Sequence, residues 1–328
     1  MTIISRRHFM GASAAALAMP AISKFAFAQG SQAWPSRPIK AVIPFTAGST
    51  VDIVGRLVLE PLGAQLGQPI VVENRGGAGG TIGSATVAKA DPDGYTILIN
   101  ASAHSAAPAA YPGVSYDTAN DFAAVASFGS VPNVCVISPA KGIKTLQELV
   151  AAAKGGTFTF ASAGVGSATH WAAERLRLSA GFAATHVPFR GGPEALTEVM
   201  TGRVDFMCIG VSSGLAFIQE SKLLPLAVCT PKRSAALPNV PTTTESGYAD
   251  SDYTFWNGLL VPAKTPREIV DRLHAEVQKA LALPAVQQKF APQGIEPMPL
   301  KLAEFDALIK KEIGINIALV KAAGIKFN

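Results

Sequence analysis

Four segments rich in glycine, serine and threonine follow predicted strands and precede predicted helices. They comprise residues 46–52, 75–81, 162–170 and 190–193. Small residues let a ligand approach the backbone, and the first N–H groups of a helix have no partner inside it, so they can bind an anion with help from the helix dipole. Any one of these segments could equally be an ordinary tight turn. Together they favour a site for a small carboxylate.

Two of these segments approach a nucleotide-binding motif without completing it. Gly77-x-Gly79 and Gly164-x-Gly166 begin like the dinucleotide fingerprint, but neither has a glycine or alanine at its third position. The phosphate-binding pattern G-x-x-x-x-G-K-[ST] does not occur in the chain. We therefore expect no cofactor.

One segment offers an enzymatic alternative. Residues 210–214 (GVSSG) fit the motif G-x-S-x-G between a predicted strand and a predicted helix, the context that an exported serine hydrolase using Ser212 would need. Such an enzyme also needs a histidine further along the chain. The only later one, His274, falls inside a predicted amphipathic helix and not on a loop. We expect a protein that is not an enzyme, with the Ser212 hydrolase as the alternative.

Several single side chains admit both a structural and a binding role. Asp52 stands in the first turn of a predicted helix, where a carboxylate caps N–H groups, and His170 follows a glycine-rich loop from which it could donate to a ligand oxygen. Asp205 could orient a loop. Arg75 and Arg190 could pair with a carboxylate ligand, although an ordinary surface ion pair is the favoured alternative for both.

Charge and cysteine usage exclude further classes of site. The chain has 328 residues and a formal net charge of +5, and its basic residues form no Lys/Arg-rich block, so we expect no nucleic-acid partner. Cys135, Cys208 and Cys229 each lie in an apolar run, which is typical of buried free thiols, although oxidising surroundings would permit one disulfide. The chain lacks the patterns C-x-x-C and H-E-x-x-H, and we expect no metal.

The first 28 residues have the pattern of an export signal. Residues 5–10 (SRRHFM) match a twin-arginine signal, an apolar run follows, and Ala26-Phe27-Ala28 supplies a small-residue cleavage site. The apolar stretch is well short of the ~20 residues that span a bilayer. We expect export by the twin-arginine or the general route, with cleavage after Ala28. The mature protein would then be soluble in the periplasm.

Short apolar runs alternate with helical patterns along the rest of the chain. The first runs are residues 39–45, 70–73 and 95–100, and a second series begins near residue 134. This alternation predicts mostly parallel sheets built from βα units, and the length is enough for two lobes.

The order of the motifs resembles one family along essentially the whole mature chain. The matching segments are residues 34–39 (WPSRPI), 42–45 (VIPF), 52–54 (DIV), 66–69 (LGQP), 72–75 (VENR), 91–95 (DPDGY), 186–192 (HVPFRGG), 202–205 (GRVD) and 237–242 (LPNVPT). In sequence and spacing they are similar to the Bug-type solute receptors of tripartite tricarboxylate transporters.

The resemblance implies a type-II periplasmic binding-protein fold of two doubly wound α/β lobes joined by a two-segment hinge. Lobe 1 would comprise residues 29–131 and 254–328, and lobe 2 residues 132–253. Such a receptor captures a small carboxylate, possibly aromatic or dicarboxylic, between its lobes. It would be a monomer that delivers the ligand to integral-membrane transporter subunits, with a sensor protein as an alternative partner.

The resemblance also implies where the ligand lies. The residues expected to bind it are Phe45, Ala47, Gly48, Ser49, Thr50, Asp52, Ala78, Thr81, Ser102, Ser162, Gly166, Ser167, Thr169, His170, Phe189 and Asp205. One departure bears on specificity, because the family's first loop usually reads Gly-Gly-Gly-Thr-Asp and residues 48–52 here read GSTVD. The identity of the ligand therefore cannot be inferred from that of a relative's ligand.

Overall fold

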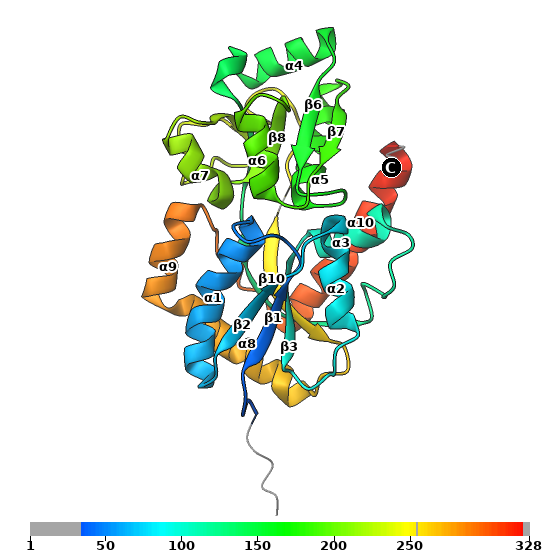
Figure 1. Cartoon of the computed structure of the whole chain (residues 1–328), viewed down its shortest axis with the longest axis vertical. Coiled ribbons are helices and arrows are strands. Elements are labelled where there is room, and N and C mark those ends of the chain that lie inside the picture. The colour runs from blue at the N-terminus through cyan, green and yellow to red at the C-terminus, as the bar shows by residue number, and fades with distance from the viewer. Residues whose placement is uncertain (1–33, 254, 324–328) are drawn as a thin grey trace, which may run out of the picture. The chain divides into compact units, whose positions relative to one another are not determined.

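The protein is described by a computed structural model that covers residues 34–253 and 255–323 (Figure 1). The expected export signal, residues 1–28, lies outside the described residues. Two five-stranded sheets form the framework, in the order β2-β1-β3-β10-β4 and β7-β6-β8-β5-β9. No helix in the described part of the chain has the length and apolar content needed to cross a bilayer.

The first sheet and its helices are built from the two ends of the described chain. Its strands are β1 (Ile39–Ile43), β2 (Ile70–Asn74), β3 (Thr96–Ala101), β4 (Phe122–Ser130) and β10 (Trp256–Pro262). Its helices are α1 (Thr50–Leu66), α2 (Thr81–Ala88), α3 (Ala103–Ala110), α8 (Arg267–Ala282), α9 (Pro284–Phe290) and α10 (Leu302–Ala323). We call this set of elements the first lobe.

The second sheet is built from the middle of the chain. Its strands are β5 (Asn133–Ile137), β6 (Thr159–Ser162), β7 (Thr185–Pro188), β8 (Phe206–Gly210) and β9 (Leu224–Val228). Its helices are α4 (Leu146–Gly155), α5 (Ala168–Ala180), α6 (Gly192–Met200) and α7 (Val211–Gln219). We call this set the second lobe.

Each sheet contains one strand that runs against its neighbours. β10 pairs antiparallel with β3 and β4, and β5 pairs antiparallel with β8 and β9. Each is the first strand formed after the chain passes from the other sheet. Asn133 begins β5 opposite Gly210, the last residue of β8, and Trp256 begins β10 opposite Ser130, the last residue of β4. The chain therefore enters each sheet at the carboxyl ends of the parallel strands, where ligands bind in open α/β sheets.

The long helices that begin at these edges start and stop at recognisable residues. The Ser49 hydroxyl caps α1 by accepting from the N–H of Asp52, and Gly67 ends the helix in the left-handed conformation at φ 70°. Ser167 and Gly181 do the same for α5, with φ 66° at the glycine. A serine cap satisfies an N–H group that has no helical partner, and glycine adopts a positive φ without steric cost.

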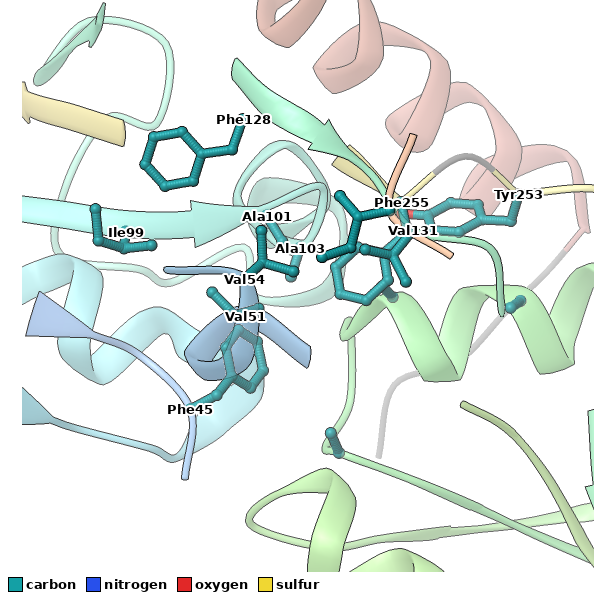
Figure 2. Close-up of a cluster of buried hydrophobic side chains, with 14 of the residues drawn as sticks. Phe45, Val51, Val54, Ile99, Ala101, Ala103, Phe128, Val131, Tyr253 and Phe255 are labelled. Atoms are coloured by element: carbon teal, nitrogen blue, oxygen red, sulfur yellow. The ribbon is translucent and has the colours of Figure 1, made fainter. Parts of the chain in front are cut away.

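A continuous apolar core runs through the region where the chain passes between the sheets. Phe45 and Val51 of the first lobe belong to the same cluster as Val131 and Phe255 of the crossing segments (Figure 2). The two crossing segments are hydrogen-bonded to each other, because the N–H of Val131 donates to the carbonyl of Phe255 at 2.9 Å. The loops on either side of this core are thus held close together.

The three cysteines lie in the core of the second lobe. Cys135 and Cys208 face each other on β5 and β8, and Cys229 follows β9. All three are buried and free, which confirms the prediction of buried thiols. The Sγ atoms of Cys208 and Cys229 are 3.8 Å apart. Hydrogen bonds with Cys135 and Cys229, together with burial, raise the pKa of the Cys208 thiol, so it stays protonated and unreactive.

Candidate functional site

A small cavity lies at the carboxyl edge of both sheets. Its wall combines residues from each lobe and from one crossing segment: Phe45, Ser49, Thr50, Val51, Ala103, Ala163, Ser167, Ala168, Thr169, Gly192, Ile209 and Phe255. None of these side chains is charged. The volume is about 20 Å³, which is about the space that one water molecule needs. The two lobes are therefore closed on each other around this point.

Two long helices from different lobes begin at this cavity. Their capping residues Ser49 and Ser167 both line it, and the two caps have nearly the same geometry, with φ −68° and ψ 158° at Ser49 and φ −68° and ψ 160° at Ser167. Each hydroxyl accepts from the N–H three residues on, at 3.4 Å in α1 and 3.3 Å in α5. The positive ends of two helix dipoles thus meet at one neutral cavity, an arrangement that favours an anion.

The carboxylate of Asp52 organises the first of these loops. It accepts from the N–H of Gly48, from Nε of Arg56 and from Nδ2 of Asn74, each at 2.9 Å. Asn74 Nδ2 also donates to the carbonyl of Phe45 at 3.0 Å. Because its oxygens already accept three hydrogen bonds within the first lobe, Asp52 acts here as a structural support for the loop, and it does not line the cavity.

Hydroxyl groups organise the second loop in the same way. Thr169 Oγ1 accepts from the N–H of Ala163 at 2.9 Å and lies 3.0 Å from Ser167 Oγ. Ser167 Oγ donates to the carbonyl of Gly164 at 2.6 Å, and Ser162 Oγ accepts from the N–H of the same glycine at 3.1 Å. The loop therefore keeps its shape through its own side chains, and Ser167, Ala168 and Thr169 at the start of α5 line the cavity.

Two stacked imidazoles support this loop from behind. His170 Nδ1 accepts from the N–H of Gly166 at 3.1 Å, and His186 Nε2 lies 2.6 Å from Ser162 Oγ. Burial lowers the pKa of His186 to about 4, and burial followed by the charge of His186 lowers the pKa of His170 to about 2. Both rings are therefore neutral near pH 7, and they shape the loop without adding a positive charge.

The structure divides the predicted binding residues into groups. Those that line the cavity are Phe45, Ser49, Thr50, Ser167 and Thr169. Those that hold its loops by hydrogen bonds are Gly48, Asp52, Ser162, Gly166 and His170. Ala47 is exposed in the first loop, Thr81 donates to the carbonyl of Ala78 at the start of α2, and Ser102 is buried between β3 and α3.

Ala78 and Phe189 lie together in a second, open pocket of about 530 Å³. Its wall comprises Gly77, Ala78, Gly79, Tyr111, Gly164, Val165, Pro188, Phe189, Arg190 and Glu194. The Tyr111 hydroxyl donates to the carbonyl of Val165 at 3.1 Å and so joins the lobes beside this pocket. Arg190 is exposed there, whereas Arg75 pairs with Glu73, the surface interaction that was the favoured alternative.

Asp205 lies apart from these residues. Its carboxylate accepts from Nζ of Lys141 at 2.5 Å and from the N–H and hydroxyl of Thr159, both at 2.8 Å. Thr159 begins β6, and the parallel strand β8 begins directly after Asp205. Asp205 is therefore at the end of the sheet opposite to Ser162 and the cavity, and its interactions tie the sheet together at that end.

Apart from Phe45, the large apolar residues of the cavity wall were not predicted from the sequence. Val51, Ala103, Ile209 and Phe255 look like core residues in sequence, and most of each side chain is indeed core. These residues become part of a cavity wall only because the two lobes meet at this point. No sequence pattern marks them as a wall.

The hydrolase alternative gains no catalytic arrangement. Ser212 Oγ is buried and bonds no described residue, and His274 Nδ1 lies 2.7 Å from the carbonyl of Val125 in the first lobe. Within residues 34–253 and 255–323, no cluster of three or more His, Cys, Asp or Glu side chains could hold a metal ion.

Comparison with known proteins identifies the family. The model of the "Tripartite tricarboxylate transporter family receptor" matches residues 54–325. A protein from Pseudomonas sp. (strain P51), described as the "UPF0065 protein in tcbD-tcbE intergenic region", is 38% identical over 272 residues, which are 82% of this chain and 81% of the relative.

Solved structures agree. The periplasmic binding protein BugD has a TM-score of 0.86 and 32% identity, covering 89% of this chain and 99% of its own. MatC from Rhodopseudomonas palustris with bound malate has a TM-score of 0.82 and 30% identity over 87% of this chain and 99% of its own. A second R. palustris protein, with adipate, has a TM-score of 0.86 and 29% identity over 89% and 99%. This chain, with its two α/β lobes, belongs to the Bug-type receptors of the tripartite tricarboxylate transporter family and has the periplasmic binding-protein fold.

Proposed function

We propose that the protein captures a small organic acid between its two lobes and delivers it to the membrane subunits of a tripartite tricarboxylate-type transporter. The observation that carries this proposal is the pair of capped helix starts, Ser49 and Ser167, which line one cavity from different lobes. Preorganised N–H groups that converge on an uncharged space can replace the water around a carboxylate.

The relatives support the same class of ligand. One was solved with malate and another with adipate, and both compounds carry two carboxylates. In this chain the cavity wall combines hydroxyls and N–H groups with the apolar side chains of Val51, Ile209 and Phe255. We propose that hydroxyls and amides hold the carboxylate and that the apolar residues contact the carbon chain.

We propose a ligand site smaller than the set expected from sequence. Phe45, Ser49, Thr50, Ser167 and Thr169 would contact the acid, because they line the cavity. Gly48, Asp52, Ser162, Gly166 and His170 would position these residues through the hydrogen bonds described above. Asp205 is left out because it lies at the other end of its sheet.

Binding requires the lobes to separate and close again. A cavity of about 20 Å³ does not hold a dicarboxylate, so the acid would enter an open form and stabilise the closed one, a shift between two populations. We propose lobes of residues 29–131 with 254–328, and 132–253, and a hinge at the paired segments around Val131 and Phe255. We also propose that the mature chain begins after Ala28 and works in the periplasm.

Isothermal titration calorimetry of the purified mature chain tests this function. The panel comprises malate, adipate and benzoate, with dimethyl adipate as the matched compound without charge. We expect saturable binding of at least one acid and none of the diester. A protein that gives no heat with any of the acids, or that binds the diester as well as adipate, would contradict the proposal.

A further inference from the structure

The segment that matches the hydrolase motif has a different role in the structure. Residues 210–214 join β8 to α7, and α7 contacts α1 of the first lobe. Because Ser212 has no histidine partner, the motif needs another explanation. Two other residues of the motif, Gly210 and Ser213, supply that explanation, because both contact Thr50.

Ser213 forms a pair of polar contacts with the first lobe. Its Oγ lies 2.9 Å from Thr50 Oγ1 and donates to the carbonyl of Gly48 at 3.3 Å. The side chains of Thr50 and Ser213 are both buried. Buried hydroxyls that satisfy each other in this way are costly to separate unless water or another partner replaces the contact.

Gly210 makes the approach of Thr50 possible. A Cβ atom at residue 210 would overlap Thr50 Oγ1 and would lie 2.9 Å from Thr50 Cγ2, and the three nearest atoms to that position all belong to Thr50. The backbone at Gly210, with φ −58° and ψ 131°, is one that any residue can adopt. Glycine is therefore needed here only for space, and only while the two lobes are in contact.

Thr50 connects these contacts to the ligand site. It is the first residue of α1, and it lines the cavity next to the capping residue Ser49. Other glycines also allow close approach, such as Gly79 against Val165 and Gly191 against Thr46. The contact between Gly210 and Thr50 differs from these because it fixes the position of a side chain that lines the cavity.

We propose that Gly210 and Ser213 form a closure latch, defined as the contacts of these two residues with Thr50 and Gly48. The latch positions Thr50 against the bound acid and slows release of the acid by stabilising the closed form. This inference rests on the proposed receptor function, and it makes Gly210 and Ser213 positioning residues that do not touch the ligand.

The test compares variants that alter the latch with variants that leave it intact. Ser213→Ala removes the hydroxyl, Ser213→Thr keeps it, and Gly210→Ala adds the obstructing methyl group. Ser212→Ala is the matched serine control. Gly113→Ala is the matched glycine control, because a Cβ there meets no atom within 4 Å.

Release rates of malate and adipate are measured by stopped-flow displacement. For Ser213→Ala we expect release roughly 2- to 10-fold faster, the equivalent of one hydrogen bond, with little change in the association rate. For Gly210→Ala we expect roughly 5- to 100-fold faster release, the equivalent of overpacking by one methyl group. Ser213→Thr is expected to restore most of the wild-type rate, and both controls are expected to match the wild type.

A second measurement does not depend on either acid. Hydrogen exchange of the amides of residues 48–53 is compared in ligand-free wild type, Ser213→Ala and Ser212→Ala, and we expect faster exchange only in Ser213→Ala. If an acid binds and Ser213→Ala releases it at the wild-type rate, the latch is wrong while the receptor function stands. If neither acid binds, equal exchange in Ser213→Ala and wild type rejects the latch, whereas the receptor function is judged by the calorimetric panel. A lower melting temperature of ligand-free Gly210→Ala would also count against it, because the three atoms nearest to the added methyl all belong to Thr50 of the other lobe.

Discussion

The imidazole rings of His170 and His186 stack with their centroids 4.0 Å apart and 13° from parallel. Phe160 stacks on His186 at 4.8 Å and extends the arrangement into the core of the second lobe. The pair stands directly behind the loop that carries Ser162 and Ser167. Its protonation state therefore bears on the stability of the lobe as well as on the shape of the loop.

The stability of the protein should fall in mild acid because of this pair. Both pKa values lie below the ordinary 6.5, at about 4 for His186 and about 2 for His170, so the unfolded chain binds more protons than the folded one. The stabilisation is complete above pH 6.5 and is lost as the pH falls toward the folded pKa values. For His186 the loss at pH 4.5 is about 2 to 3 kcal/mol.

Urea denaturation of wild type and His186→Gln at pH 7 and pH 4.5 measures this loss. We expect the difference in unfolding free energy between the two pH values to be smaller in His186→Gln. Some pH dependence should remain, because burial also lowers the pKa of His104 to about 4. Equal pH dependence in both proteins would show that His186 does not contribute.

Removing the two capping hydroxyls should weaken both stability and binding. Ser49→Ala and Ser167→Ala should each lower the unfolding free energy by about 1 kcal/mol and should also lower the affinity for the acid, because both residues line the cavity. Thr145→Ala is the matched control. The Thr145 hydroxyl caps α4 by accepting from the N–H of Glu148 at 3.1 Å, and Thr145 does not line the cavity. Calorimetry that finds the same affinity in all three variants would remove the capped helix starts from the site.

Replacing Asp52 should disorganise the first loop. Asp52→Ala leaves Gly48, Arg56 and Asn74 without their shared acceptor, and we expect a loss of about 1 to 3 kcal/mol in unfolding free energy, as for other buried polar groups without a partner. We also expect weaker ligand binding. Asp271→Ala is the control, because Asp271 forms an exposed ion pair with Arg267 on α8, and such pairs contribute little. Equal thermal stability of the two variants would contradict the support role of Asp52.

Replacing Asp205 should lower the stability of the protein without lowering its affinity for the acid, unlike replacing the capping serines. Asp205→Ala removes the acceptor for Lys141 and Thr159, so thermal denaturation should show a clear loss of stability. Affinity for the acid should stay within about twofold of wild type, since a residue at the far end of the sheet adds no ligand contact. Lost affinity in a variant that remains folded would return Asp205 to the binding site.

Part of this architecture could be predicted from sequence, and the reasons differ from element to element. α1 was predictable because its apolar residues keep a helical spacing and Gly67 ends it. β4 (FAAVASFGS) and α3 (AHSAAPAA) were not predicted, since small residues and Pro108 obscure any period. Asp205 was misplaced because short segments between elements do not reveal at which end of a sheet they lie.

The antiparallel strands β5 and β10 were also beyond a sequence pattern. Their composition matches that of the parallel strands around them, and their direction follows from the passage of the chain between lobes. The same holds for Ser213, whose partner Thr50 is 163 residues away. A local motif suggested Ser212 as a nucleophile, whereas the tertiary fold pairs the next serine, Ser213, with a hydroxyl from the other lobe.

The pairing of Ser130 with Trp256 in the first sheet has a topological consequence. Ser130 is the last residue before the chain leaves the first sheet and Trp256 is the first strand residue after it returns. The second lobe is therefore an insertion between two residues that are neighbours on adjacent strands. Because the two ends of this insertion are fixed side by side on β4 and β10, its length does not set the register of these two strands. Replacing residues 131–255 with the corresponding segment of a relative would therefore need only two junctions, which lie side by side in the first sheet.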